Sequence, residues 1–126
     1  MPGSAKLFLA LGALFAAAAV TLGALGAHGL RARLSAEALA IFQTGVQYHF
    51  WHALGLLAVG IVCIHFPENG WLRAAGFLLA IGVMLFSGSL YVLALGGAKW
   101  LGALAPIGGG ALILAWIAFA IAVLRA

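Results

Sequence analysis

The sequence predicts an all-α fold, an integral membrane bundle of four antiparallel transmembrane helices. The first observation is composition, because 67% of the 126 residues are hydrophobic and 6% are charged. A soluble domain is about 45–50% apolar and about 25% charged. The second observation is that the six basic and two acidic residues leave four long uncharged runs. A bilayer core about 30 Å thick needs about 20 helical residues, so each run predicts one crossing. The runs are residues 7–30, 38–67, 74–98 and 100–124.

The composition also excludes several classes of protein. So few charges cannot cover a soluble globule, and a mean hydropathy of +1.24 excludes a disordered chain. The formal net charge of +4 does not indicate a nucleic-acid partner, because the basic residues are scattered at predicted helix ends, where they anchor a membrane helix. Cys63 is the single cysteine, so an intramolecular disulfide is impossible. Residues 1–126 are predicted to form one domain.

The first two helices are predicted at about 7–27 and 36–64. Ser35 can cap the second helix, and Glu37 lies in its first turn, where a carboxylate favours the helix dipole. The first third of this helix is the most polar intramembrane stretch of the chain. We expect its polar face to turn into the bundle and the opposite face, which holds Phe42, to contact lipid. The polar residues are Gln43, Thr44, Gln47, Tyr48, His49 and His52.

The third and fourth helices are predicted at about 73–95 and 106–124. Pro106 can open the last helix, since the first turn of a helix has backbone N–H groups without partners. Small residues recur at helical spacing on helices one, three and four, and such stripes let transmembrane helices approach closely. The glycines expected at helix contacts are Gly12, Gly23, Gly26, Gly76, Gly108 and Gly109.

Antiparallel connectivity brings the unusual residues toward one side of the membrane. We call face A the side with the N-terminus, the second connection and the C-terminus, and face B the side with the first and third connections. Lysines and arginines are divided three and three between the faces, so the positive-inside rule favours neither orientation. Because polar groups in hydrocarbon need partners, a polar network or shallow cavity is predicted in the face-B half. Its candidate residues are His28, Gln47, Tyr48, His49, His52, Ser87, Ser89 and Tyr91.

Four motifs in the order of the chain resemble one known family. They are Gly26–Leu30, Gln47–Leu54, Phe86–Tyr91 and Pro106–Gly109, and together they are similar to the domain of unknown function 423 family. That family consists of small bacterial inner-membrane proteins and is similar to the eukaryotic transmembrane protein 256 group. The resemblance implies four transmembrane helices in a bacterial inner membrane, and it implies no activity.

The residues themselves favour no catalytic or cofactor chemistry. His49 and His52 could share a metal with His28, but a structural metal wants more ligands than the chain supplies. Haem ligation needs histidines on facing helices at matched depth, and the third and fourth helices have none. Ser87 or Ser89 could pair with a histidine as a nucleophile, and Gly108–Gly110 could bind an anion; hydrogen bonding and close packing are the favoured interpretations. No catalytic residue, metal or cofactor is expected.

Two functions remain from the sequence. The first is a non-enzymatic accessory or structural membrane component, with membrane lipids as neighbours and a homo-oligomer or larger membrane complex as its assembled form. The stripes of small residues favour it, because they exceed what a lone bundle needs. The alternative is a binder of a small molecule, such as a quinone or a lipid headgroup, that uses the polar cluster near face B.

Overall fold

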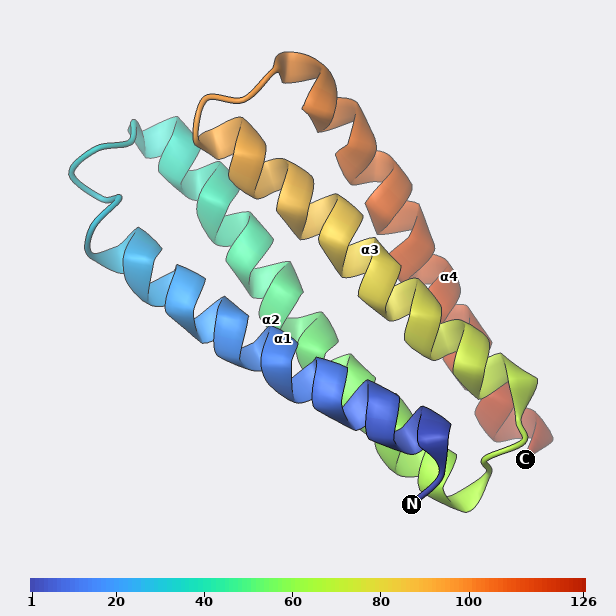
Figure 1. Ribbon diagram of the computed structural model, residues 1–126. Coiled ribbons are helices and arrows are strands. Elements are labelled where there is room, and N and C mark those ends of the chain that lie inside the picture. The colour runs from blue at the N-terminus through green and yellow to red at the C-terminus, as the bar shows by residue number, and fades with distance from the viewer.

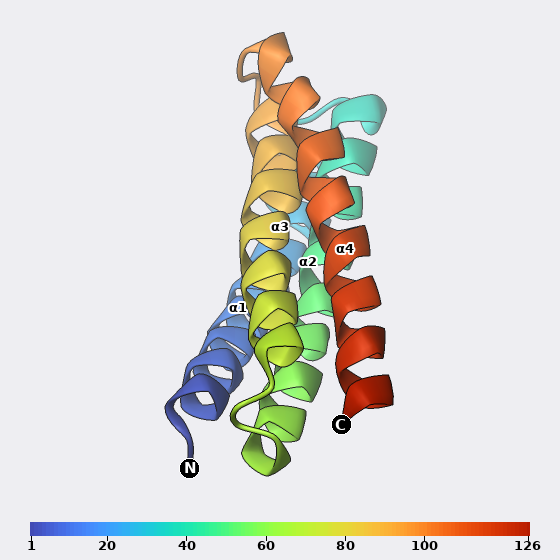
Figure 2. The same cartoon turned by 90° about the vertical axis from the view of Figure 1, so that its right-hand side faces the viewer.

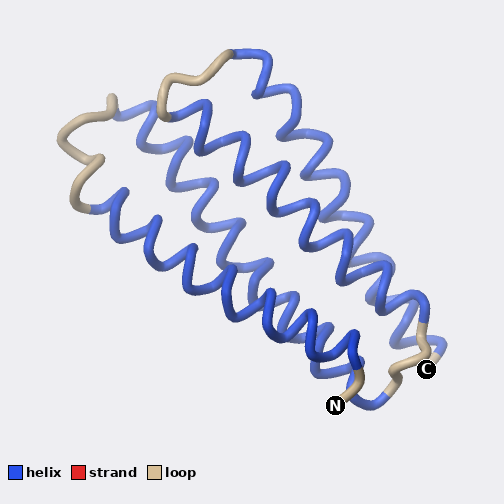
Figure 3. The backbone as a smooth tube through the Cα atoms, viewed as in Figure 1, coloured by secondary structure: helices blue, strands red, loops and turns tan.

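The computed structural model describes residues 1–126 and contains only helices and their connections (Figure 3). The elements are α1 (Gly3–Ala27), α2 (Ala36–His65), α3 (Gly70–Ala94), the 3₁₀ helix η1 (Lys99–Ala103) and α4 (Leu104–Arg125). Four helices, the last taken together with η1, are long and apolar enough to cross a membrane. The all-α class and the four spanning helices predicted from the sequence are therefore confirmed.

Consecutive helices run in opposite directions. Gly12 of α1 meets Leu57 of α2, whereas Gly26, further along α1, meets Phe42, earlier on α2. Helices α2 and α3 form the centre, with α1 packed on α2 and α4 packed on α3. Figures 1 and 2 show the two termini at the end of the bundle that holds the α2–α3 connection. That end is face A, and the other two connections lie together at face B.

Two helices begin earlier than the sequence analysis expected. Helix α1 starts at Gly3 rather than residue 7, because its first turn buries Ala5. Helix α3 starts at Gly70 rather than residue 73, because the Asn69 side chain accepts hydrogen bonds from the backbone N–H groups of Trp71 and Leu72. Asparagine is a strong N-cap residue, and a helix start at residue 73 left it outside the first turn.

The fourth helix also begins earlier, at Leu104, directly after η1. Pro106 is therefore the third residue of α4, which is still within the first turn, where a missing N–H costs no hydrogen bond. Helix α3 ends at Ala94, and two residues later Gly96 has a φ of +93°, a conformation that glycine adopts without strain. Helices α3 and α4 pack against each other along most of their length (Figure 2).

One apolar core occupies the middle of the bundle and its face-A half. Phe8 of α1 is fully buried in it and contacts Phe77 edge-on, with ring centroids 5.2 Å apart. Gly76 makes room for that ring, since a Cβ at this position would lie 2.3 Å from Phe8 Cζ. The four helices all contribute to the core, whose larger members are Phe8, Leu56, Val59, Leu72, Leu79, Val83 and Leu112.

The other expected packing glycines differ in how closely they are approached. A Cβ at Gly108 would lie 2.4 Å from the backbone nitrogen of Phe86, so α4 and α3 touch backbone to backbone there. Gly12 and Gly26 of α1 leave similar room for side chains of α2. At Gly23 the nearest atom would be 3.3 Å away and at Gly109 it would be 3.6 Å away, so these two are looser contacts.

The sequence analysis predicted the wrong rotation of α2 about its own axis. Phe42 is 1% exposed and packs against Gly26 of α1, so the face assigned to lipid is the face that binds α1. Gln43 and Gln47 are instead exposed on the outer surface. In lipid, helices associate through van der Waals packing, and the large ring of Phe42 packs closely against the small residues of α1. The polar arc of α2 is consequently divided between the inside and the outside.

Candidate functional site

A hydrogen-bonded pair lies at the centre of the bundle where α2 faces α3. His49 Nδ1 is 2.8 Å from the Tyr91 hydroxyl, and the two rings lie 6.0 Å apart between centroids. Tyr91 reaches this place because Gly45 has no side chain: a Cβ there would lie 2.8 Å from Tyr91 Cε1. One helical turn before Tyr91, Ser87 Oγ donates a 2.7 Å hydrogen bond to the Gly45 carbonyl. Three polar side chains thus tie α2 to α3.

A groove of about 250 Å³ opens beside this network, between α1 and α3. The two helices make few contacts with each other, so His49 on α2 lies at the bottom of the space between them. Phe15 of α1 stands edge-on to the His49 ring, with centroids 5.9 Å apart. The remaining lining is apolar apart from the network, and the lining residues are Phe15, Ala18, His49, Val83, Met84, Ser87, Gly88 and Tyr91.

His52 lies in a different environment, three residues further along α2. Its Nδ1 donates a 2.6 Å hydrogen bond to the Tyr48 carbonyl of its own helix. Its ring lies 5.7 Å from the Trp116 ring of α4, between centroids, and 6.0 Å from the Tyr48 ring. His52 is 7% exposed, so it is a packed residue of the α2–α4 contact and does not join the His49–Tyr91 pair.

The structure does not bring the rest of the expected cluster together. His28 and Gln47 are exposed, and Tyr48 is 36% exposed. Ser89 is buried, but its hydroxyl donates to the Phe86 carbonyl of its own helix. The cluster predicted from eight residues therefore reduces to His49, Ser87 and Tyr91.

The geometry of the network bears on its chemistry. A serine nucleophile needs a base that accepts its proton, but the Ser87 proton is directed to the Gly45 carbonyl, and the His49 Nδ1 is engaged by Tyr91. His, Cys, Asp and Glu side chains form no group of three or more that could hold a metal ion. What the arrangement offers is a set of neutral hydrogen-bonding groups beside an apolar groove.

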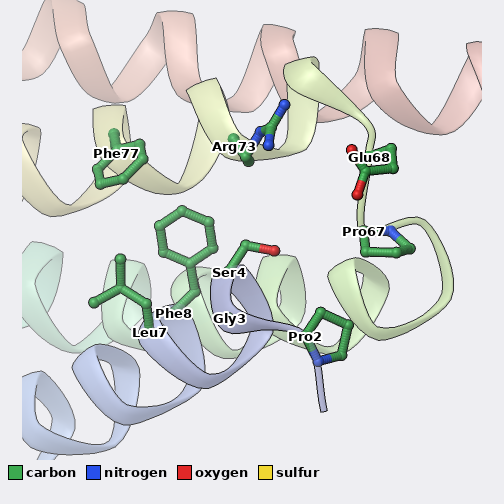
Figure 4. A pocket seen from close by; sticks show the side chains of 9 residues that line it. All are labelled: Pro2, Gly3, Ser4, Leu7, Phe8, Pro67, Glu68, Arg73 and Phe77. Carbon is green, nitrogen blue, oxygen red and sulfur yellow. The ribbon is translucent and has the colours of Figure 1, made fainter.

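A second hollow, of about 350 Å³, lies at face A and was not predicted from the sequence (Figure 4). It is formed where the start of α1, the α2–α3 connection and the start of α3 meet. Phe8 and Phe77 form its apolar side, and Glu68 and Arg73 stand at its charged rim (Figure 4). Its residues come from two segments, 2–8 and 67–77, that are far apart in the chain, so only the tertiary fold brings them together. A charged rim beside an apolar side is the arrangement typical of the boundary between lipid headgroups and hydrocarbon.

The fold and the hydropathy define a four-helix, multi-pass membrane protein. Residues 22–109 match the family described as "Protein of unknown function (DUF423)". The UPF0382 membrane protein YwdK of Bacillus subtilis is 44% identical over 120 residues, which cover 95% of this chain and 98% of that protein. A UPF0382 membrane protein of Staphylococcus epidermidis is 45% identical over 121 residues, which cover 95% of this chain and 97% of its own. The chain belongs to this family of uncharacterised membrane proteins, and no solved structure matches it.

Proposed function

We propose that this protein is a non-enzymatic accessory component of the bacterial cytoplasmic membrane that acts as a dimer of identical chains. The observation that supports this proposal is the outward polar face of α2, where Gln43, Thr44 and Gln47 are exposed. The Ser87 hydroxyl and the His49 ring are engaged with other groups, which favours a role without catalysis. Membrane lipids cover the remaining apolar surface.

The depth of these residues makes their exposure costly. Gln47 comes eleven residues after the start of α2 at Ala36, which is about 17 Å along a helix that rises about 1.5 Å per residue. A side-chain amide at that depth has no water to bond with, and an unsatisfied polar group in hydrocarbon costs several kcal/mol. The Thr44 hydroxyl donates to the Ala40 carbonyl of its own helix. The two glutamine amides are the groups that gain most from a partner.

A second copy of the chain satisfies those amides by symmetry. Each amide has a donor and an acceptor, so two Gln47 side chains related by a two-fold axis can bond to each other. A groove of about 350 Å³ beside Gln47, between α1 and α2, leaves room for side chains of the second copy. Interhelical bonds of this kind contribute about 0.6–2 kcal/mol each, enough to bias association when the small residues of α1 add contact.

The test is the association state in lipid vesicles, measured by energy transfer between donor-labelled and acceptor-labelled chains. The wild-type protein is expected to dimerise, and the double variant Gln43→Leu, Gln47→Leu is expected to be monomeric at the same density. Thr21→Val is the matched control, because Thr21 is an exposed polar residue of α1 whose hydroxyl bonds to its own helix. A monomeric wild-type protein, or a double variant that still dimerises, would contradict the proposal.

A further inference from the structure

The groove between α1 and α3 lies within the membrane-spanning part of the bundle, in its face-B half. His49, at its floor, is the fourteenth of the 30 residues of α2, so it lies about 20 Å from the nearer helix end at about 1.5 Å per residue. Phe15 is the central residue of α1. Phospholipid headgroups remain outside the hydrocarbon core. A molecule that enters this groove must therefore be one that dissolves in the interior of the bilayer.

The lining restricts the charge and the size of that molecule. No Lys, Arg, Asp or Glu is present among the lining residues, so an ion would lose its hydration without gaining an opposite charge. An apolar cavity of about 150 Å³ is enough to hold benzene, and the groove measures about 250 Å³. The space suits one substituted ring, with an apolar tail left in the surrounding lipid.

The network supplies one directional contact. In the neutral imidazole of His49, Nδ1 is either an acceptor or a donor of the hydrogen bond with Tyr91. If Tyr91 donates to Nδ1, the tyrosine oxygen remains free to accept a bond from a hydroxyl. If Nδ1 donates to Tyr91, the tyrosine hydroxyl is free to donate to a carbonyl. In either case the hydroxyl has one hydrogen-bonding function left after His49 has been satisfied.

We propose that the α1–α3 groove is a binding site for a neutral, lipophilic ring molecule that carries a hydroxyl or carbonyl oxygen, with Tyr91 as its hydrogen-bonding partner. His49 positions the tyrosine hydroxyl, and Phe15 and Val83 contact the ring. Gly88 lines the groove, and a side chain added there would have room to enter it, because a Cβ at this position would meet no atom within 4 Å. The site is independent of the outward face of α2.

The experiment uses three probes that share a decyl tail: decylhydroquinone, decylbenzoquinone and decylbenzene. Binding is measured by equilibrium dialysis against the full chain in lipid nanodiscs, with protein-free nanodiscs to correct for partition into lipid. Saturable binding of one of the two oxygenated probes is expected, tighter than decylbenzene by about tenfold, the equivalent of one hydrogen bond. If decylhydroquinone binds more tightly, Tyr91 accepts the hydrogen bond, and if decylbenzoquinone binds more tightly, Tyr91 donates it.

Four variants make the result specific to the groove. Gly88→Leu fills the space and is expected to abolish saturable binding, whereas Gly110→Leu adds the same side chain to α4, also at a position with no atom within 4 Å, and should bind as the wild type does. Tyr91→Phe is expected to bind oxygenated and unoxygenated probes equally. Met84→Trp fills the same groove from a residue that is 58% exposed, and it replaces Gly88→Leu if that variant does not fold.

Two results would overturn the proposal. One is equal uptake by wild-type and groove-filled nanodiscs, which would mean that the probes only dissolve in lipid. The other is a preference for oxygenated probes that survives in Tyr91→Phe, which would place the contact elsewhere.

Discussion

The two halves of the bundle use the same helices in different ways. Toward face A, inside the hollow at the helix ends, α1 and α3 meet through the fully buried ring of Phe8, which fills the space that Gly76 leaves. Toward face B, the same two helices leave a groove above His49, and no atom lies within 4 Å of where a side chain at Gly88 would begin. Gly76 and Gly88 lie on one helix and differ only in what faces them.

The difference concerns the packing between α1 and α3, which is close at Phe8 and is replaced by a groove beside Gly88. Close packing of side chains against small residues is a main source of helix association in lipid, and between α1 and α3 it occurs toward face A, where Phe8 meets Gly76. The face-B half has a histidine, a serine and a tyrosine at its centre, whose hydrogen bonds hold α2 to α3. Polar groups in a membrane interior mark functional sites more often than structural ones. We therefore expect the contact between α1 and α3 at Phe8 to contribute to stability, and the face-B groove between the same helices is where we propose that a ligand binds.

The largest difference in stability is expected when the same substitution, glycine to alanine, is made at Gly76 and at Gly88 of α3. Gly76→Ala brings a methyl group to 2.3 Å from the Phe8 ring, and overpacking of this kind costs about 1–3 kcal/mol. Gly88→Ala meets no atom and should stabilise the helix by about 0.5–1 kcal/mol. The free energy of unfolding in mixed micelles titrated with sodium dodecyl sulfate measures both. Equal effects at the two positions would remove the distinction between a closed half and an open half.

A smaller difference is expected between the helix caps at the two faces. Asn69 at face A caps α3 and also donates a 3.2 Å hydrogen bond to the Ala122 carbonyl of α4. Ser35 at face B only caps α2, by accepting from the Ala38 N–H. A lost cap costs about 1 kcal/mol and a lost hydrogen bond about 1 kcal/mol more, so Asn69→Ala should destabilise about twice as much as Ser35→Ala. If Ser35→Ala is the more damaging variant in the same unfolding assay, the α3–α4 link at face A has no energetic role.

How far the sequence predicted this structure depends on the kind of signal. The four crossings follow from charges at the ends of long apolar runs, which is a local property. The rotation of α2 about its axis does not, because the choice between burying Phe42 and burying Gln43 depends on Gly26 of another helix.

The same limit applies to the candidate site. His49, Ser87 and Tyr91 were predicted to converge, but Gln47 and Tyr48 have the same polarity and lie on the outside. The hollow at Glu68 and Arg73 joins distant segments and has no sequence pattern.

The two tyrosines of the chain provide a test of the polar network in the face-B half. Tyr91→Phe removes the partner of the His49 ring and is expected to cost about 1–1.5 kcal/mol, the usual net value of a hydrogen bond in a protein. Tyr48→Phe is the control, since Tyr48 is 36% exposed and surface changes are usually within about 0.5 kcal/mol. The unfolding free energies are compared in the same micelles. A larger loss in Tyr48→Phe would indicate that the outer surface, not the network, holds α2 in place.

The smallest expected change in stability distinguishes a serine hydrogen bond between two helices from a serine hydrogen bond within one helix. Ser87 and Ser89 are both buried on α3, but Ser87 donates to Gly45 of α2 whereas Ser89 donates to Phe86 of its own helix. Ser87→Ala should therefore cost about 0.6 kcal/mol, the average found by double-mutant cycles for hydrogen bonds between membrane helices. Ser89→Ala should be nearly neutral, because a serine that bonds back to its own helix adds little stability. Hydrogen exchange at the amides around Gly45 gives an independent measure, and faster exchange is expected in Ser87→Ala alone. Were both variants to loosen α2 equally, the contact between α2 and α3 would depend on shape and not on the polar network that we assign to the site.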